Sequence, residues 1–165
     1  MEQSPALYTN LGQGGVSVDP NEALAMLNAY RNRHGLNSLS LDEKLNKAAQ
    51  EEADAMAGAV KVSHALTPDL TLVKRLRRAG YEPAIATENI GAGYWTLAEA
   101  FSGWRDSHRH NANMLREGVT QMGIATQYRE NVKYKVFWSL ILAKPDEGRG
   151  AQPLSQTRPS NLFAH

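Results

Sequence analysis

Apolar residues recur every three or four positions through the first two thirds of the chain, a spacing that predicts helices. The clearest stripe lies between residues 40 and 60 and comprises Leu41, Leu45, Ala48, Ala49, Glu52, Ala53 and Met56. Ser40 can cap this helix, with Glu43 three residues later completing a capping box. Glu52 is the charged member of the stripe, and we interpret it as an edge residue whose carboxylate reaches water.

Helix start and stop signals predict three more helices, at residues 19–35, 70–79 and 96–106. Asp19 can cap the first of them, with Pro20 at the first helical position and Gly35 as a left-handed end. Trp104 lies on the inward face of the last helix, and a shorter helical turn should follow it through Leu115.

Strand patterns come late in the sequence and predict strands at residues 84–90, 119–128 and 132–142. The last two should form a hairpin through residues 129–131. Because the run at 136–142 is apolar on both faces, we expect that strand to be central, with helices on both sides. Helices before and between antiparallel strands predict an α+β fold, a three-layer α-β-α sandwich with a short antiparallel sheet.

The length of 165 residues and the 42% hydrophobic content predict one domain with one core. We divide the chain into a flexible N-terminal arm (1–18), the domain (19–143) and a mobile C-terminal tail (144–165). The formal charge of +1 does not indicate a surface that binds nucleic acid or an anionic membrane. We interpret the basic run at 74–78 as a solvated helix face. No apolar run reaches the roughly 18 residues that span a bilayer. We therefore expect a monomer with no nucleic-acid partner and no membrane span.

The chain contains no cysteine, so its core must hold the fold without disulfides. The start, residues 1–5, lacks the basic and apolar regions of a signal peptide. On this ground the protein is either cytosolic or has had a leader removed.

Candidate chemistry lies in three separate segments, Ser63-His64, 87–90 and 107–113. Together they supply the imidazoles of His64 and His110 and the carboxylate of Glu88, which could hold a divalent metal or act as an acid/base site if folding brings them together. A lone histidine in a loop is most often a hydrogen-bonded structural residue, so the shared cleft is a hypothesis. Serine-type catalysis has little support, because no Gly-x-Ser-x-Gly elbow is present.

The order of these segments resembles the CAP superfamily, whose name joins cysteine-rich secretory proteins, antigen-five proteins and pathogenesis-related proteins. The bacterial, disulfide-free branch is the closer match. The resemblance runs from residue 22 to residue 143 and is carried by residues 27–31 (N-x-x-R), 45–53, Ser63-His64, Glu88-Asn89-Ile90, 104–115 (W-x-x-S-x-x-H-x-x-N-x-L) and 119–125.

The resemblance implies a cleft lined by two histidines and two glutamates. The cleft residues carried over by position are His64, Glu88, Ser107, His110 and Asn113. Ser107 stands where the second glutamate is usual, and Arg109 replaces the glycine before the second histidine, so it narrows or charges the rim. The implied ligands for zinc or another divalent cation are His64, Glu88 and His110.

The resemblance also implies a secreted or periplasmic protein. Its leading function is a binding or effector module for a small molecule, a lipid or a protein. One alternative is a metal-dependent hydrolase of envelope or extracellular polymers, with Glu88 as the base. A passive envelope scaffold is the other. We favour the binding module over an enzyme.

Overall fold

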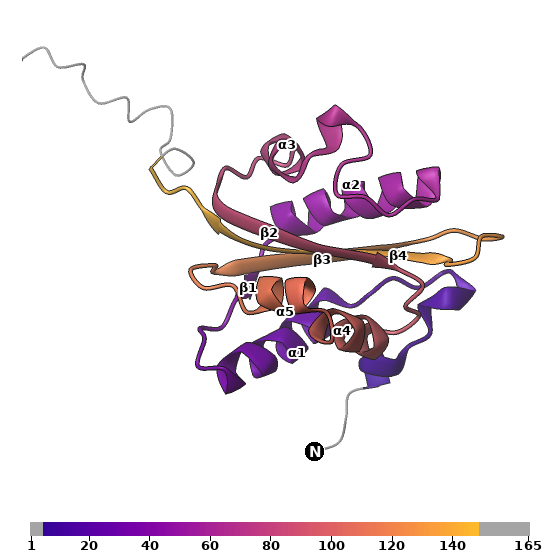
Figure 1. Ribbon diagram of the computed structural model, residues 1–165, viewed down its shortest axis with the longest axis horizontal. Helices are drawn as coiled ribbons and strands as arrows, with labels where there is room; N and C mark the ends of the chain where they lie inside the picture. Colours follow the sequence, from indigo (N-terminus) through magenta and orange to yellow (C-terminus); the bar gives the residue numbers. More distant parts are fainter. Residues whose placement is uncertain (1–4, 149–165) are drawn as a thin grey trace, which may run out of the picture.

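The computed structural model describes residues 5–148, which form one sheet between two layers of helices (Figure 1). The strand order is β1-β3-β4-β2. The strands are β1 (Ser40–Leu41), β2 (Pro83–Ala92), β3 (Gln121–Tyr128) and β4 (Val136–Pro145). Strands β2 and β3 both run antiparallel to β4, and the short β1 runs parallel to β3. The α-β-α sandwich is thus confirmed, with β1 as a strand that was not predicted.

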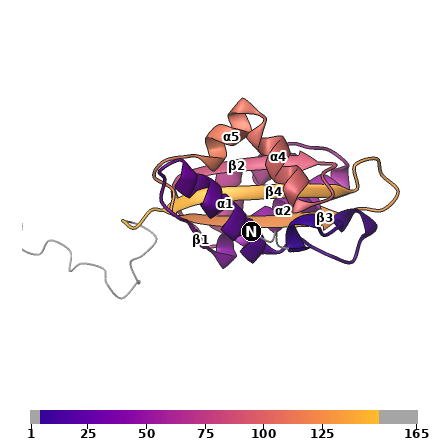
Figure 2. The ribbon, with the colours of Figure 1, turned by 90° about the horizontal axis from the view of Figure 1, so that it is seen from below.

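Two groups of helices cover opposite faces of the sheet (Figures 1 and 2). One face carries α2 (Glu43–Ala59) and α3 (Leu72–Arg78), with a 3₁₀ turn at Pro68–Leu70 before α3. The other face carries α1 (Pro20–Arg33), α4 (Leu97–Arg105) and α5 (His108–Met114). None of the helices in residues 5–148 is long and apolar enough to cross a bilayer.

The starts of α1 and α2 show where a capping pattern in the sequence predicts the helix boundary correctly and where it does not. Asp19 caps α1 as predicted, because its side chain accepts a hydrogen bond from the backbone N–H of Asn21 at 2.9 Å. The predicted cap of α2 was wrong. Asp42 caps this helix, while Ser40 lies in β1 and its backbone N–H donates to Thr120 O at 3.1 Å. The pairing of Ser40 with Gln121 in β3, rather than the local capping pattern, decides this boundary.

Strand β4 is central and buried on both faces, as its apolar run predicted. Its side chains alternate between the two helical layers. Those facing α1, α4 and α5 are Val136, Trp138, Leu140 and Leu142. Phe137, Ile141 and Ala143 pack toward α2 and α3. The turn before β4 is longer than predicted and includes residues with positive φ at Asn131 and Lys135.

Residues 5–18 pack against the domain more closely than the expected loose arm. Leu11 is 3% exposed, and its backbone N–H donates to Trp95 O at 2.7 Å. Val18 is also buried, with its N–H bound to Thr126 Oγ1. Of the two short 3₁₀ turns here, Pro5–Tyr8 and Leu11–Gln13, the second contains buried residues, and no periodic pattern marks the packing in the sequence. The predicted tail begins with the end of β4, and its residues 149–165 lie outside the described part of the chain.

Candidate functional site

Glu88 lies near the middle of β2, which is an edge strand of the sheet. Ala86 and Ile90, two positions away on either side, pack with residues of α2, so the alternation of the strand directs Glu88 toward the same layer. The side chain of Glu88 is 1% exposed. A carboxylate can remain charged at such a position only when hydrogen bonds and opposite charge replace water.

Four hydrogen bonds occupy the carboxylate of Glu88. Arg75 donates from Nη2 to Oε1 and from Nη1 to Oε2, each at 2.9 Å. His64 Nδ1 donates to Oε1 and Ser139 Oγ donates to Oε2, also at 2.9 Å. Burial alone would raise the pKa of Glu88, but the hydrogen bonds from His64, Arg75 and Ser139 lower it below its usual value. Glu88 is therefore an ionised carboxylate with two donors on each oxygen.

Arg75 joins several elements beneath the site. Its guanidinium is fully buried and forms a bidentate pair with Glu88. Nε donates to Leu70 O at 2.8 Å, while Nη1 and Nη2 donate to Ala48 O and His64 O at 3.3 Å. One side chain thus ties together α2, α3, β2 and the segment that carries His64.

Glu52 is a second carboxylate beside this arginine. It is fully buried, and its Oε2 lies 3.0 Å from Arg75 Nε. The Nε–H bond points to Leu70 O, so neither oxygen of Glu52 receives a hydrogen bond within the described residues. Burial raises the pKa of Glu52 to about 7, against the opposing effect of the Arg75 charge. The interpretation of Glu52 as a solvated edge residue was wrong.

His64 is held in one orientation by Glu88. Because the ionised carboxylate only accepts hydrogen bonds, Nδ1 of His64 carries the proton. The side chain is 57% exposed, and Nε2 has no hydrogen-bond partner within residues 5–148. The hydrogen bond to Glu88 raises the pKa of His64, although burial opposes the shift. His64 therefore presents Nε2 outward, as an acceptor when neutral and as a donor when charged.

A pocket of about 240 Å³ lies beside His64. It is lined by His64, Ser107, Arg109, His110 and Asn113. Asn113 Nδ2 donates to Glu88 O and Asn89 Oδ1, and Asn89 Nδ2 donates to His110 O, at 2.9 to 3.2 Å. These bonds fasten α5 to β2, so the pocket spans the edge strand between the two helical layers.

The predicted cleft residues are therefore not equivalent. His64, Ser107, His110 and Asn113 line one pocket, whereas Glu88 lies beneath it. Burial lowers the pKa of His110, and the nearby charges of His64 and Arg109 lower it further. The pKa values of the two pocket histidines are thus shifted in opposite directions, upward for His64 and downward for His110.

The donor set expected for a divalent metal does not fit this arrangement. Within residues 5–148 no three His, Cys, Asp or Glu side chains are grouped so that they could hold a metal ion. Both oxygens of Glu88 already accept hydrogen bonds, two of them from the Arg75 cation. The ligand set of His64, Glu88 and His110 therefore stays a prediction, and in this arrangement Glu88 has no oxygen free to share with the two histidines. Glu88 instead accepts a hydrogen bond from His64 Nδ1 and so fixes the orientation of the imidazole ring.

Arg75, Glu52 and Ser139 belong to the site but were missed. Residues 74–78 were interpreted as a solvated face, yet Arg75 is fully buried beside the inward Leu76. The position of Glu52 inside an apolar stripe was a usable signal, because a charged residue there needs a buried partner. Nothing local marks Ser139, which pairs with Ile90 across two strands distant in sequence.

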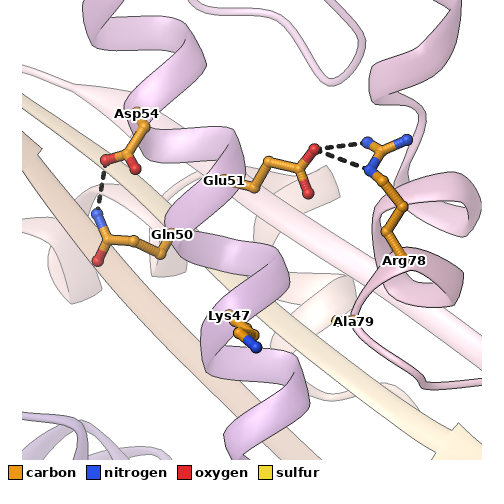
Figure 3. Close-up of a pocket in the computed structure, with 6 residues that line it drawn as sticks. All are labelled: Lys47, Gln50, Glu51, Asp54, Arg78 and Ala79. Atoms are coloured by element: carbon orange, nitrogen blue, oxygen red, sulfur yellow. Dashed lines mark hydrogen bonds and ion pairs between the residues drawn. The ribbon is translucent and has the colours of Figure 1, made fainter.

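Another pocket, of about 380 Å³, lies between α2 and α3 on the outer surface (Figure 3). Four of its side chains pair with one another. Both Nε and Nη2 of Arg78 donate to Glu51 Oε1, and Gln50 Nε2 donates to Asp54 Oδ1 at 2.8 Å. Exposed pairs of mixed sign are typical of a solvated helix surface, so this pocket is not treated as the functional site.

Comparison with known proteins gives one family and several relatives. The model of the cysteine-rich secretory protein family, CAP, matches residues 24–142. The uncharacterized protein YkwD of Bacillus subtilis (strain 168) is 27% identical over 116 residues, which are 70% of this chain and 45% of that protein. The chain thus spans less than half the length of this relative.

Solved structures give the same fold. An extracellular protein containing an SCP domain from Bacillus anthracis str. Ames is 27% identical, with a TM-score of 0.66 over 76% of this chain and 40% of that one. An outer surface protein from Borrelia burgdorferi is 18% identical, with a TM-score of 0.67 over 80% of this chain and 99% of that one. At 18% identity the likeness shows the fold alone.

Proposed function

Since this chain belongs to the cysteine-rich secretory protein family, CAP, we propose that it is an extracellular binding module. Its ligand site is the pocket formed by His64 and α5, and the ligand is a small polar molecule or group. The extracellular setting is supported by the Bacillus anthracis relative, which is described as an extracellular protein. The chain covers only part of its Bacillus relatives, so the proposal concerns this domain.

The observation that carries the proposal is the buried cluster beneath His64. Burying Arg75, Glu88 and Glu52 costs free energy, and apolar residues at such positions often stabilise a protein more. The cluster fixes the ring of His64 through Nδ1, and the same ring lines the pocket with no hydrogen bond to Nε2 among the described residues. Groups with displaced pKa values concentrate at functional sites, and His64, Glu88 and His110 are displaced together here.

The hydrolase alternative is less well supported. It needs Glu88 as a base, but all acceptor positions of Glu88 are taken and its pKa is lowered. A base must also reach the proton that it removes, and Glu88 lies beneath the pocket rather than in it. A passive scaffold is the function that would remain if the pocket bound no ligand.

Histidine NMR tests the proposal directly. The protein would be titrated with neutral saccharides, alkylamines, small carboxylates, phosphate esters and zinc, with the imidazole signals as the readout. We expect at least one probe class to shift His64 and His110 while His34, which lies at the end of α1, stays unchanged. His110→Ala should remove the response, and the matched exposed variant His108→Ala should keep it. Absence of any response from folded protein at millimolar probe would contradict the proposal.

A further inference from the structure

We infer that a separate pocket, between the first 3₁₀ turn and α4, binds a methylated ammonium group. The turn at Pro5–Tyr8 contacts α4, and the two elements lie side by side (Figure 1). The pocket has a volume of about 630 Å³ and is lined by Tyr8, Tyr94, Thr96, Ala98, Glu99 and Ser102. It shares no lining residue with the pocket beside His64, so the inference goes beyond the proposed function.

The charge of this pocket favours a cation. Glu99 is the only charged residue among the six that line it. Its side chain is exposed in the first turn of α4 and forms no ion pair within residues 5–148. Oε2 accepts a hydrogen bond from the backbone N–H of Trp95 at 3.3 Å, and no donor of the described residues reaches Oε1. The start of a helix carries roughly half a positive charge, so the full charge of the carboxylate leaves this surface negative.

Two tyrosine rings line the pocket together with this carboxylate. Tyr8 is 52% exposed. Tyr94 lies against Gly91 and Gly103, where an added Cβ would come within 2.9 Å and 2.6 Å of its ring, and it meets Trp104 edge to face. The position of the Tyr94 ring is thus set by its packing, whereas Tyr8 is open to a ligand. Aromatic rings attract cations, and methylated ammonium ligands are recognised by several such rings.

The same groups disfavour other charged ligands. An anion would meet the charge of Glu99 without a Lys or Arg among the lining residues. A divalent cation needs several oxygen ligands, and a primary ammonium is strongly hydrated, so one carboxylate is a poor substitute for water in both cases. A methylated ammonium has no N–H groups to satisfy and needs only apolar surface and negative charge. The volume also lies within the range of small-ligand pockets, roughly 300–1,000 Å³.

The experiment is an NMR titration of the full chain with choline, tetramethylammonium, methyl glucoside and uncharged dimethylbutanol, in which carbon replaces the nitrogen of choline. The backbone amides of Trp95 and Glu99 are the readout, because the first donates to the Glu99 carboxylate and the second to Thr96 Oγ1. We expect both ammonium compounds to shift these signals saturably and to bind more weakly as ionic strength rises. Dimethylbutanol should bind roughly tenfold more weakly than choline.

Variants separate the contributions of charge and ring. Glu99→Gln removes the charge and keeps the start of α4, because glutamine also serves at this position of a capping box. It should weaken choline binding about threefold, as for an exposed charge pair. Tyr8→Ala should weaken binding about fivefold, and Tyr8→Phe should restore it, because the ring and not the hydroxyl meets the cation. Glu117→Gln removes an exposed glutamate outside the pocket and should bind choline like wild type.

A methylated ammonium can belong to a lipid head group or to a free molecule. Sedimentation with phosphatidylcholine vesicles distinguishes these sources. Sedimentation that Glu99→Gln reduces would support the site with a lipid head group as its ligand. Choline binding without sedimentation would support the site with a free molecule.

Three results would overturn the inference. Equal binding of choline and dimethylbutanol would show that charge plays no part. Choline binding that is unchanged in Glu99→Gln or in Tyr8→Ala would reject the site. A lack of response to both ammonium compounds, with or without a response to the saccharide, would reject the ligand class. The pocket beside His64 is tested through the histidine signals, so the failure of one site is distinguishable from the failure of the other.

Discussion

The two faces of the sheet are packed by different chemistry. Toward α1, α4 and α5 the core is mainly apolar, and Trp104 and Trp138 meet edge to face with ring centroids 6.2 Å apart. Toward α2 and α3 the apolar core is interrupted by Glu52, Arg75 and Glu88, all buried. The first face contributes stability, whereas the second also fixes the orientation and charge of a surface histidine.

Arg31 shows that a buried charge alone does not make a site. It is fully buried like Arg75, but its guanidinium donates to neutral groups, among them Met114 O at 3.0 Å and Arg116 O at 2.9 Å. That arrangement joins α1 to the end of α5 and involves no other titrating group. Arg75 instead contacts two carboxylates, so the α2 and α3 face responds to pH.

Arg75→Met should have the largest effect. It leaves Glu88 and Glu52 buried without their cation, so we expect a loss of roughly 5 kcal/mol in the free energy of unfolding at neutral pH. The sign of the pH dependence follows from Glu88. Its lowered pKa stabilises the fold above the unfolded pKa, and that stabilisation disappears as pH falls. Urea denaturation at neutral and acid pH should show a smaller loss in acid. An equal loss at both would contradict the charged role of this face.

Trp104→Ala tests the apolar face. The side chain is 1% exposed, and its Nε1 donates to Ile90 O at 3.2 Å. We expect a loss of about 4 kcal/mol from the cavity and the lost hydrogen bond. The loss should be the same at neutral and acid pH, because no titrating group is removed. A small loss in denaturation, together with weaker ligand binding, would instead identify Trp104 as a ligand-contacting residue.

Glu52→Gln should change how the free energy of unfolding depends on pH, rather than lower it at every pH. The pKa of Glu52 is about 7 in the fold against 4.5 for the reference group, so its burial is tolerated below about pH 4.5 and becomes costly as pH rises through about 7. The cost reaches about 3 kcal/mol, which the amide avoids. The variant should therefore gain stability over wild type at pH 8, measured by urea denaturation. Parallel pH profiles would contradict this, and the exposed control Glu51→Gln should match wild type.

The sequence alone was sufficient to predict the helices and strands, but not how the buried charged side chains pair. Local caps and apolar periodicity located α1 and the central β4, because both signals lie within a few residues of the element. They failed at Ser40, where a strand pairing overrides the local pattern. The motif positions led to His64 and His110, which do share a pocket. The role of Glu88 could not be predicted, because it depends on Arg75, which comes from α3.

The most direct test is the pair of microscopic pKa values of His64 and His110, measured by NMR titration of their imidazole signals in the protein without ligand. We predict that His64 titrates above the usual histidine value near ~6.5 and His110 below it. The difference follows from the hydrogen bond of His64 to Glu88 and from the burial of His110. Equal values, or His110 titrating above His64, would contradict a pocket built on an oriented, protonatable His64.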